Sequence, residues 1–205
     1  HLTDAQLGYV FSAFTFAYAL MEIPSGWLAD RFGPRLMLTR IVIWWSAMTA
    51  ATGWAAGFAS LFIVRLLFGI GEAGCFPSMA RAYARWLPAR EHARAFGLAV
   101  RTGALGGALT QRLVVWMLAG MSWRHTFPVF GAVGVVWAVA WYWWFRDDPH
   151  RHASVNPAEL ELIGSDPPAP HPVVPWRAVL TNRTVWMVCL MYFGVIYGWY
   201  FFLTW

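Results

Sequence analysis

The stretch Gly26-Trp27-Leu28-Ala29-Asp30-Arg31-Phe32-Gly33-Pro34-Arg35 separates two long apolar runs, residues 12–29 and 36–56. Each run is about long enough to cross a bilayer as a helix, which takes ~20 residues. The glycine-proline pair in the stretch forces a turn, and its three charged side chains make that turn polar. The stretch therefore predicts a tight loop on one membrane surface, with arginines of the kind kept on the cytoplasmic side.

Composition indicates a membrane protein with several spans. The chain has 205 residues, of which 59% are hydrophobic and only 12% are charged, whereas soluble domains carry about 25% charged residues. All fifteen basic residues are arginines. Because they sit in short loops at the ends of apolar runs, membrane orientation explains them better than nucleic-acid binding does. Cys75 and Cys189 lie in apolar runs without metal-ligand spacing, so we expect buried thiols and no metal site.

The apolar runs predict six membrane helices, at residues 5–29, 35–56, 60–85, 91–119, 123–145 and 181–205. Thr3 and Gln6 form a capping-box pattern that opens the first helix. The polar, proline-rich residues 146–175 are typical of a loop or linker, and Asn156-Pro157-Ala158-Glu159 within them predicts the start of a short surface helix. Residue 1 is not Met, and we expect the sequence to be part of a longer chain.

Charge predicts the orientation of these helices. If the loop at residues 30–35 is cytoplasmic, all arginines at predicted helix ends lie on the cytoplasmic side except Arg124. Arg65, Arg101 and Arg112 fall within the predicted spans. This strong positive-inside bias supports the helix assignment independently of any motif.

The order G-x-L-A-D-R-x-G-x-R at residues 26–35 resembles the loop between helices 2 and 3 of the major facilitator superfamily of transporters. The resemblance implies an all-α fold of twelve membrane helices in two halves, of which this chain would hold helices 2 to 7. It implies that residues 1–146 belong to the first half, 147–180 to the central cytoplasmic loop and 181–205 to helix 7. The residues that would form a gating motif are Gly26, Asp30, Arg31, Gly33 and Arg35.

Two ionisable residues lie inside the third predicted span. Arg65 and Glu72 are seven residues apart, which places them on one helix face. Such groups are costly in a membrane, at least ~2.5 kcal/mol at the centre, and are functional candidates by default. Gly69 and Gly71 between them allow close helix contact or bending. The two groups are either structural, as an ion pair or as polar groups bonded to neighbouring helices, or they form a unit whose charges are coupled, because protonation of the carboxylate loosens its hold on the arginine.

The pattern R-x-x-x-G-x-G-x-A at residues 65–73, followed by Phe76 and Pro77, resembles helix 4 of the anion:cation symporter family. This family includes hexuronate, glucarate and galactonate permeases. The resemblance implies proton-coupled symport of a small organic anion, such as a sugar acid, by alternating access of two helical bundles. In that interpretation Glu72 carries the proton and Arg65 is its partner.

Four further residues are candidates for substrate binding. Arginine can hold a carboxylate through two parallel hydrogen bonds, and tyrosine can donate a hydrogen bond to a substrate hydroxyl. We expect these roles for Arg101 and for Tyr18, Tyr197 and Tyr200, although each tyrosine equally fits the membrane interface. Glu22 fits either a gate or a snorkelling side chain.

The chain also departs from the family pattern. Many members have an arginine where this chain has Ala104, and many carry Pro-Pro where it has Gln111-Arg112. Residues 103–107 do not contain the antiporter motif G-P-x-x-G-G, and the absence of this motif favours symport. A facilitator or antiporter of the same fold is the main alternative.

The remaining expectations concern the class of protein and its surroundings. The sequence has no HExxH or GxSxG motif and no paired catalytic carboxylates that would indicate an enzyme. A membrane enzyme or a channel is therefore the less favoured alternative. We expect no cofactor other than the proton as coupling ion. The expected partners are a small organic anion and the lipid bilayer, without nucleic acid, for a monomer in a bacterial inner membrane.

Overall fold

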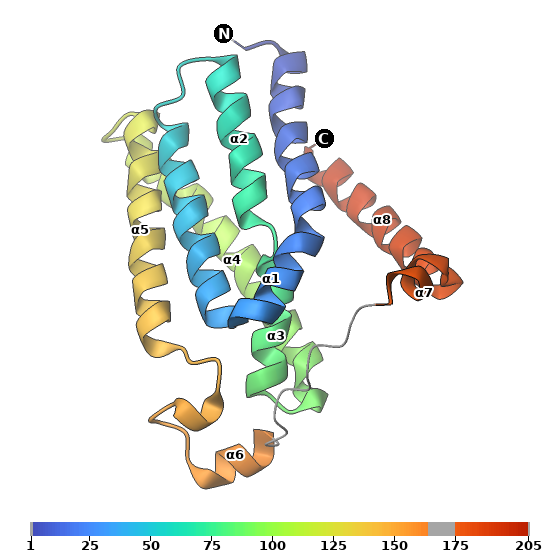
Figure 1. Ribbon diagram of the computed structural model, residues 1–205. Coiled ribbons are helices and arrows are strands. Elements are labelled where there is room, and N and C mark those ends of the chain that lie inside the picture. The colour runs from blue at the N-terminus through green and yellow to red at the C-terminus, as the bar shows by residue number, and fades with distance from the viewer. Residues whose placement is uncertain (1, 164–174, 205) are drawn as a thin grey trace. The chain divides into compact units, whose positions relative to one another are not determined.

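The computed structural model describes residues 2–163 and 175–204, and side chains as far as residue 198. The chain divides into two compact units, His1–Ser165 and Asp166–Trp205. The described residues form helices and turns without a strand (Figure 1). The helices of the first unit are α1 (Asp4–Thr52), α2 (Phe58–Glu72), α3 (Cys75–Trp86), α4 (His92–Leu118), α5 (Trp123–Trp144) and α6 (Pro157–Ile163), with short 3₁₀ helices at Ala89–Glu91 and Pro149–Arg151. The second unit holds α7 (Trp176–Thr181) and α8 (Arg183–Thr204).

Helix α1 is a hairpin of two arms. It begins with the predicted capping box, in which the backbone N–H of Gln6 donates to Thr3 Oγ1 at 3.3 Å and the backbone N–H of Thr3 donates to Gln6 Oε1 at 3.0 Å. It reverses at Gly33, whose φ of 80° and ψ of 156° are not helical. We call residues 4–32 the first arm and residues 34–52 the second arm; in Figure 1 the two arms meet at the turn and α2 lies between them. The predicted tight turn between two helices is confirmed.

Small residues bring the helices of the first unit close together. Helix α2 packs along α1, and α5 packs along the second arm (Figure 1). At Gly131 of α5, a Cβ atom would lie only 2.7 Å from the backbone oxygen of Ser46. Lipid supplies no hydrophobic drive for helix association, so close backbone approach through small residues is the usual means of packing in a membrane.

Three helices of the described residues are long and apolar enough to cross a membrane. They are α1, the α2–α3 segment Phe58–Trp86, and α5. With 49 residues, α1 is long enough to cross twice. Helix α4 does not reach this apolar level, and α8 is apolar from Arg183 to Gly198, the part of it whose side chains the structure describes. The predicted span at 91–119 is therefore helical but less apolar than expected, whereas the predicted span at 181–205 is an apolar helix over its described residues.

The structure corrects two predicted helix boundaries. The helix predicted at 60–85 breaks into α2 and α3, because Ala73 is not helical and Gly74 has a φ of 89°. The helix predicted to reach residue 56 ends at Thr52, where Nη1 of Arg124 donates to the free backbone oxygens of Gly53 at 3.1 Å and Ala55 at 3.0 Å.

The polar segment after α5 contains the expected short helix. Asn156 caps α6, since its Oδ1 accepts the backbone N–H of Glu159 at 2.8 Å. The rest of the predicted loop, residues 164–174, lies outside the described residues.

Candidate functional site

Four ionisable side chains gather between α1 and α2. Tyr18 and Glu22 lie one turn apart on the first arm, and Arg65 and Glu72 lie two turns apart on α2. All four are half-buried. Glu72 is close enough for its charge to interact with those of Arg65 and Glu22, and Tyr18 lies within the field of both carboxylates. The structure therefore brings three of the predicted residues together and adds Glu22 to them.

A glycine sets the closeness of the two helices at this site. A Cβ atom at Gly69 would collide with the backbone oxygen of Phe14, and Ala17 lies directly beside it. The ring of Phe14 packs edge-on against that of Phe68, with centroids 5.8 Å apart. These contacts hold the first arm against α2 one turn from Tyr18.

Arg65 and Glu72 do not form an ion pair, which would need an N–O distance of 4.0 Å or less; among the described residues neither takes part in one. The guanidinium of Arg65 instead lies 5.7 Å from the centre of the Phe68 ring, on the same helix face. The ion-pair interpretation left open by the sequence is therefore wrong for this conformation. The two groups interact through their charges without being locked to each other.

Glu22 has a structural contact that the sequence did not reveal. Its Oε2 accepts the backbone N–H of Gly74 at 2.9 Å, at the break between α2 and α3. Gly74 is the residue before α3, so the carboxylate sits at the positive end of that helix. Gly74, three residues before Pro77, was the available sequence signal for the break.

The residues of the predicted gating motif form contacts with two other helices. Asp30 pairs with Arg81 of α3. Arg35 Nε donates to the backbone oxygen of Tyr142, and the backbone N–H of Arg35 donates to Oδ1 of Asp147, both at 2.8 Å. The loop is thus tied to α3 on one side and to the end of α5 on the other. The sequence did not single out Arg81 or Asp147.

Gly33 makes the turn of α1, and the two remaining motif residues, Gly26 and Arg31, contact apolar side chains. Gly26 faces Pro77 of α3, and a Cβ atom there would lie 3.7 Å from the proline ring, an ordinary van der Waals distance, so this contact does not require glycine. The guanidinium of Arg31 lies over the rings of Trp27 and Phe32, at 5.6 Å and 5.7 Å from their centres.

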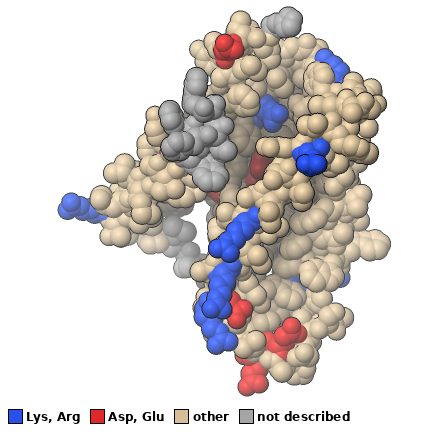
Figure 2. Space-filling view, turned by 180° about the vertical axis from the view of Figure 1, so that it is seen from behind, with Lys and Arg blue, Asp and Glu red and all other residues tan. Residues whose placement is uncertain are grey.

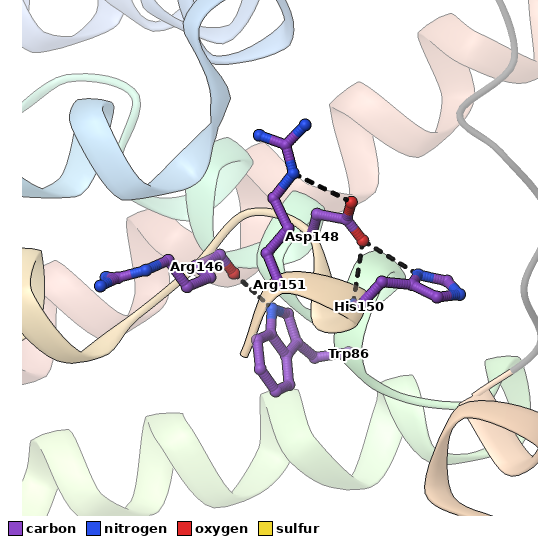
Figure 3. A network of polar contacts seen from close by, with 5 residues as sticks. All are labelled: Trp86, Arg146, Asp148, His150 and Arg151. Carbon is purple, nitrogen blue, oxygen red and sulfur yellow. Dashed lines mark hydrogen bonds and ion pairs between the residues drawn. The ribbon is translucent and has the colours of Figure 1, made fainter. Parts of the chain in front are cut away.

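The chain after α5 folds back onto the end of α3 (Figure 3). Trp86 Nε1 donates to the backbone oxygen of Arg146 at 2.9 Å. Oδ1 of Asp148 accepts the backbone N–H of His150 at 3.0 Å, and its Oδ2 lies 3.7 Å from Nε of Arg151. Burial raises the pKa of the Asp148 carboxyl, but the bonds from His150 and the charges of His150 and Arg151 outweigh this and lower the pKa overall.

Three predicted substrate-binding residues are not among the contacts described for the cluster of Tyr18, Glu22, Arg65 and Glu72. Arg101 is an exposed residue of α4. Tyr197 belongs to α8 in the second unit, where 67% of its surface is exposed. The side chain of Tyr200 lies outside the described residues. Their roles remain predictions.

Arg40 was predicted at a helix end but lies inside the second arm. Its Nε and Nη2 are buried and have no hydrogen-bond partner within the described part of the chain.

Known proteins resemble this chain over its whole length. Residues 1–205 match the profile of the Major Facilitator Superfamily. A probable sulfoacetate transporter of Cupriavidus necator is 39% identical, and the match covers 100% of this chain and 48% of that protein. A D-galactonate transporter of Escherichia coli is 33% identical, with 100% and 50% covered, and a hexuronate transporter of Bacillus subtilis is 30% identical, with 100% and 47% covered. The chain thus spans about half the length of these curated relatives.

A solved structure agrees with the fold. It is a bacterial homologue of the human lysosomal transporter Spinster, in an inward-facing and occupied conformation. It is 28% identical, with a TM-score of 0.57 over 75% of this chain and 39% of that one. With the family profile covering every residue and the fold in agreement, the chain belongs to the major facilitator superfamily, a family of transporters rather than enzymes.

Proposed function

We propose that the protein to which this chain belongs is a secondary transporter that moves a small organic anion together with a proton. The relatives named for sulfoacetate, D-galactonate and hexuronate support the substrate class, since all three compounds carry acid groups. The membrane helices support a multi-pass membrane location. We place the transporter in a bacterial inner membrane, acting as a monomer by alternating access.

The arrangement of Arg65, Glu72 and Glu22 carries this proposal. Two half-buried carboxylates and one arginine share the space between α1 and α2, and no ion pair locks Arg65 to Glu72 in the described structure. When Glu72 is ionised, its charge competes with a substrate anion for the field of Arg65. When Glu72 takes up a proton, that competition ends and Arg65 can hold the carboxylate or sulfonate of the substrate. Proton uptake and anion binding then favour each other, as linkage requires.

Tyr18 extends the same site. It lies one turn from Glu22 and within the field of both carboxylates. Its hydroxyl is a donor and acceptor at the edge of the cluster. We propose that it binds a substrate hydroxyl or acid oxygen next to Arg65, and that Tyr197 and Tyr200 contribute in the same way from α8.

Uptake by the full-length transporter in proteoliposomes, with an imposed pH gradient, tests the proposal. The labelled substrates are sulfoacetate and D-galactonate. We expect Glu72→Gln to abolish accumulation driven by the gradient but to keep exchange of external for internal substrate, because only the proton step is lost. Arg65→Ala should impair both. Glu161→Gln, an exposed carboxylate of α6, is the control and should behave as the wild type.

Each other outcome has a clear meaning. If Glu72→Gln still accumulates substrate as the wild type does, Glu72 is not the coupling group. If the wild type exchanges substrate but never accumulates it with a proton gradient, the transporter is a facilitator or antiporter of the same fold.

A further inference from the structure

Helix α4 carries a row of arginines that the cluster does not use. Arg94, Arg101 and Arg112 follow one another at spacings of seven and eleven residues. These are about two and three turns of a 3.6-residue helix, so the three side chains stack on one face. All three are exposed, and none has a hydrogen bond or ion pair within the described residues. Figure 2 shows arginine side chains in a run on the side of the molecule seen from behind.

This arginine face points away from the contacts that hold α4 in the bundle. Phe96 packs against Phe76 and Tyr83 of α3, with ring centroids 6.0 Å and 6.3 Å apart. Met117 is the one buried residue of α4. Both lie about half a turn from the arginine row. The row therefore lies opposite Phe96 and Met117, although residues 100–113 are exposed on every side of the helix in the described structure.

The depth of the row rules out plain lipid as its surroundings. At 1.5 Å per residue, Arg94 and Arg112 are roughly 27 Å apart along the helix, close to the ~30 Å thickness of the hydrocarbon core. Arginines near the two ends can snorkel to the headgroups, but Arg101 lies in between. Charged residues at such depth face the protein interior or a water-filled path. Helix α4 itself has no acidic residue to neutralise them.

We propose that the arginine face of α4 lines the water-filled path of the transported anion. This rests on the proposed function, because an anion is the cargo that these charges would attract. Arg101 would hold the carboxylate or sulfonate at mid-depth, through paired hydrogen bonds. Arg112 lies in the half of α4 farther from Arg94, and it would bind the anion where the path opens at that end of the helix. Cations spaced along a path raise the local anion concentration, and several weak sites still let the ion move on.

Cysteine labelling of the full-length transporter tests this placement. Cysteine is introduced at position 101 or 112, or in place of Leu105, which lies one turn from Arg101 on the same face and removes no charge. All native cysteines, including Cys75 and Cys189, are first replaced by serine. Matched controls are Val100→Cys and Leu113→Cys, which adjoin the arginines at equal depth but lie more than a quarter turn off the row. Each is treated with a cationic or an anionic methanethiosulfonate that dissolves only in water.

We expect cysteines at 101, 105 and 112 to react at least about tenfold faster than those at 100 and 113, since a reagent dissolved in water reaches only the wet face. Uptake of sulfoacetate and D-galactonate should fall roughly tenfold to hundredfold in Arg101→Cys, the worth of a charge-assisted hydrogen bond. The cationic reagent should restore part of it, and the anionic reagent should not.

The proposal is overturned if positions 101, 105 and 112 react no faster than the controls, or if both reagents affect uptake alike. The labelling rates can be measured without transport. A transporter without proton coupling would therefore contradict the symport proposal and could still show the labelling pattern expected here. If Arg101→Cys does not fold, Leu105→Cys reports accessibility and Arg101→Lys against Arg101→Gln reports the need for charge.

Discussion

Gly33 is the residue on which the hairpin of α1 depends. Its φ of 80° is in the left-handed region, and a Cβ atom there would lie 2.7 Å from Oδ2 of Asp147. We expect Gly33→Ala to destabilise the protein by more than ~1–2 kcal/mol, the cost of that conformation for an L-residue, because the new methyl group also displaces Asp147. The measurement is the thermal unfolding midpoint of the full-length protein in detergent.

Gly103→Ala is the matched control for this change. A Cβ atom at Gly103 meets nothing within 4 Å, and the residue lies inside α4. Alanine there should leave the midpoint unchanged or raise it slightly. Equal midpoints for Gly33→Ala and the wild type would contradict the assigned backbone conformation.

Glu22 offers a second test with single residues. Because its carboxylate accepts the N–H of Gly74 at the start of α3, Glu22→Ala should cost about 1 kcal/mol, as the loss of a helix cap does. Glu22→Gln keeps an acceptor oxygen and should cost much less. Unfolding midpoints compare the two, and equal losses would show that the charge of Glu22 matters more than its hydrogen bond.

Single residues also show where sequence-based prediction reaches its limit. The seven-residue spacing placed Arg65 and Glu72 correctly on one helix face, since helical periodicity is local. It could not place the break at Ala73 and Gly74, which is supported by Glu22, 52 residues earlier. Nor could it reveal that Arg65 stands over Phe68 rather than on Glu72.

Among the elements, the loop between the two arms of α1 is held by charged contacts to α3 and α5. Asp30→Asn and Arg81→Gln each remove one partner of the same ion pair and should lower uptake without preventing membrane insertion. More than half of the Asp30 side-chain surface is exposed, so the effect on stability should stay within ~1 kcal/mol. Uptake and membrane content of each variant are measured together.

The exchange Asp30→Arg with Arg81→Asp tests whether the two residues act as a pair. It should recover part of the uptake lost in either single charge reversal, and the double-mutant cycle gives the coupling. Additive losses would mean that Asp30 and Arg81 act separately.

The segment around Asp148 gives a prediction about pH. Its carboxyl has a folded-state pKa below the ordinary value of about 3.9. The stabilising contribution is therefore present above that ordinary value and is lost as pH falls through the lower folded-state pKa. Hydrogen exchange at the backbone N–H of His150 should lose protection in Asp148→Ala at neutral pH, because the acceptor is removed, compared with Asp147→Ala, which leaves that bond in place. Unchanged protection would show that the segment is held by Trp86 alone.

The behaviour of α4 shows how far composition predicts an element. Its residues were correctly predicted as helical, within one residue at each end. Its apolar content is lower than that of the other long helices because of Arg94, Arg101 and Arg112, and hydropathy alone does not say what faces those charges. That information comes from the packed side of the helix, which the structure identifies through Phe96 and Met117.

For the whole molecule, the pattern of apolar runs and one short motif were enough to predict the helical hairpin and the family. Runs of about 20 apolar residues and a glycine-proline turn are local features, and the bilayer restricts what they can form. The contacts that tie the hairpin to the rest, such as Arg35 with Asp147, join residues 112 positions apart. No local pattern encodes such a pairing.

Topology is the property of the whole molecule that the charges predict most directly. With the residue 30–35 loop in the cytoplasm, nearly all helix-end arginines lie on that side, as the positive-inside rule requires. The two ends of the second arm should then lie on opposite sides of the membrane. Pro34 is buried and so a poor site for a probe, whereas Phe32 and Trp54 are exposed at these two ends. We therefore expect Phe32→Cys to react with an impermeant maleimide only after cells are opened, and Trp54→Cys to react in intact cells. Both changes leave the arginines in place, so the probes do not alter the charge bias that they report. Labelling of Phe32→Cys in sealed cells, with a cytoplasmic control protein still unlabelled, would reverse the orientation of every helix in the first unit.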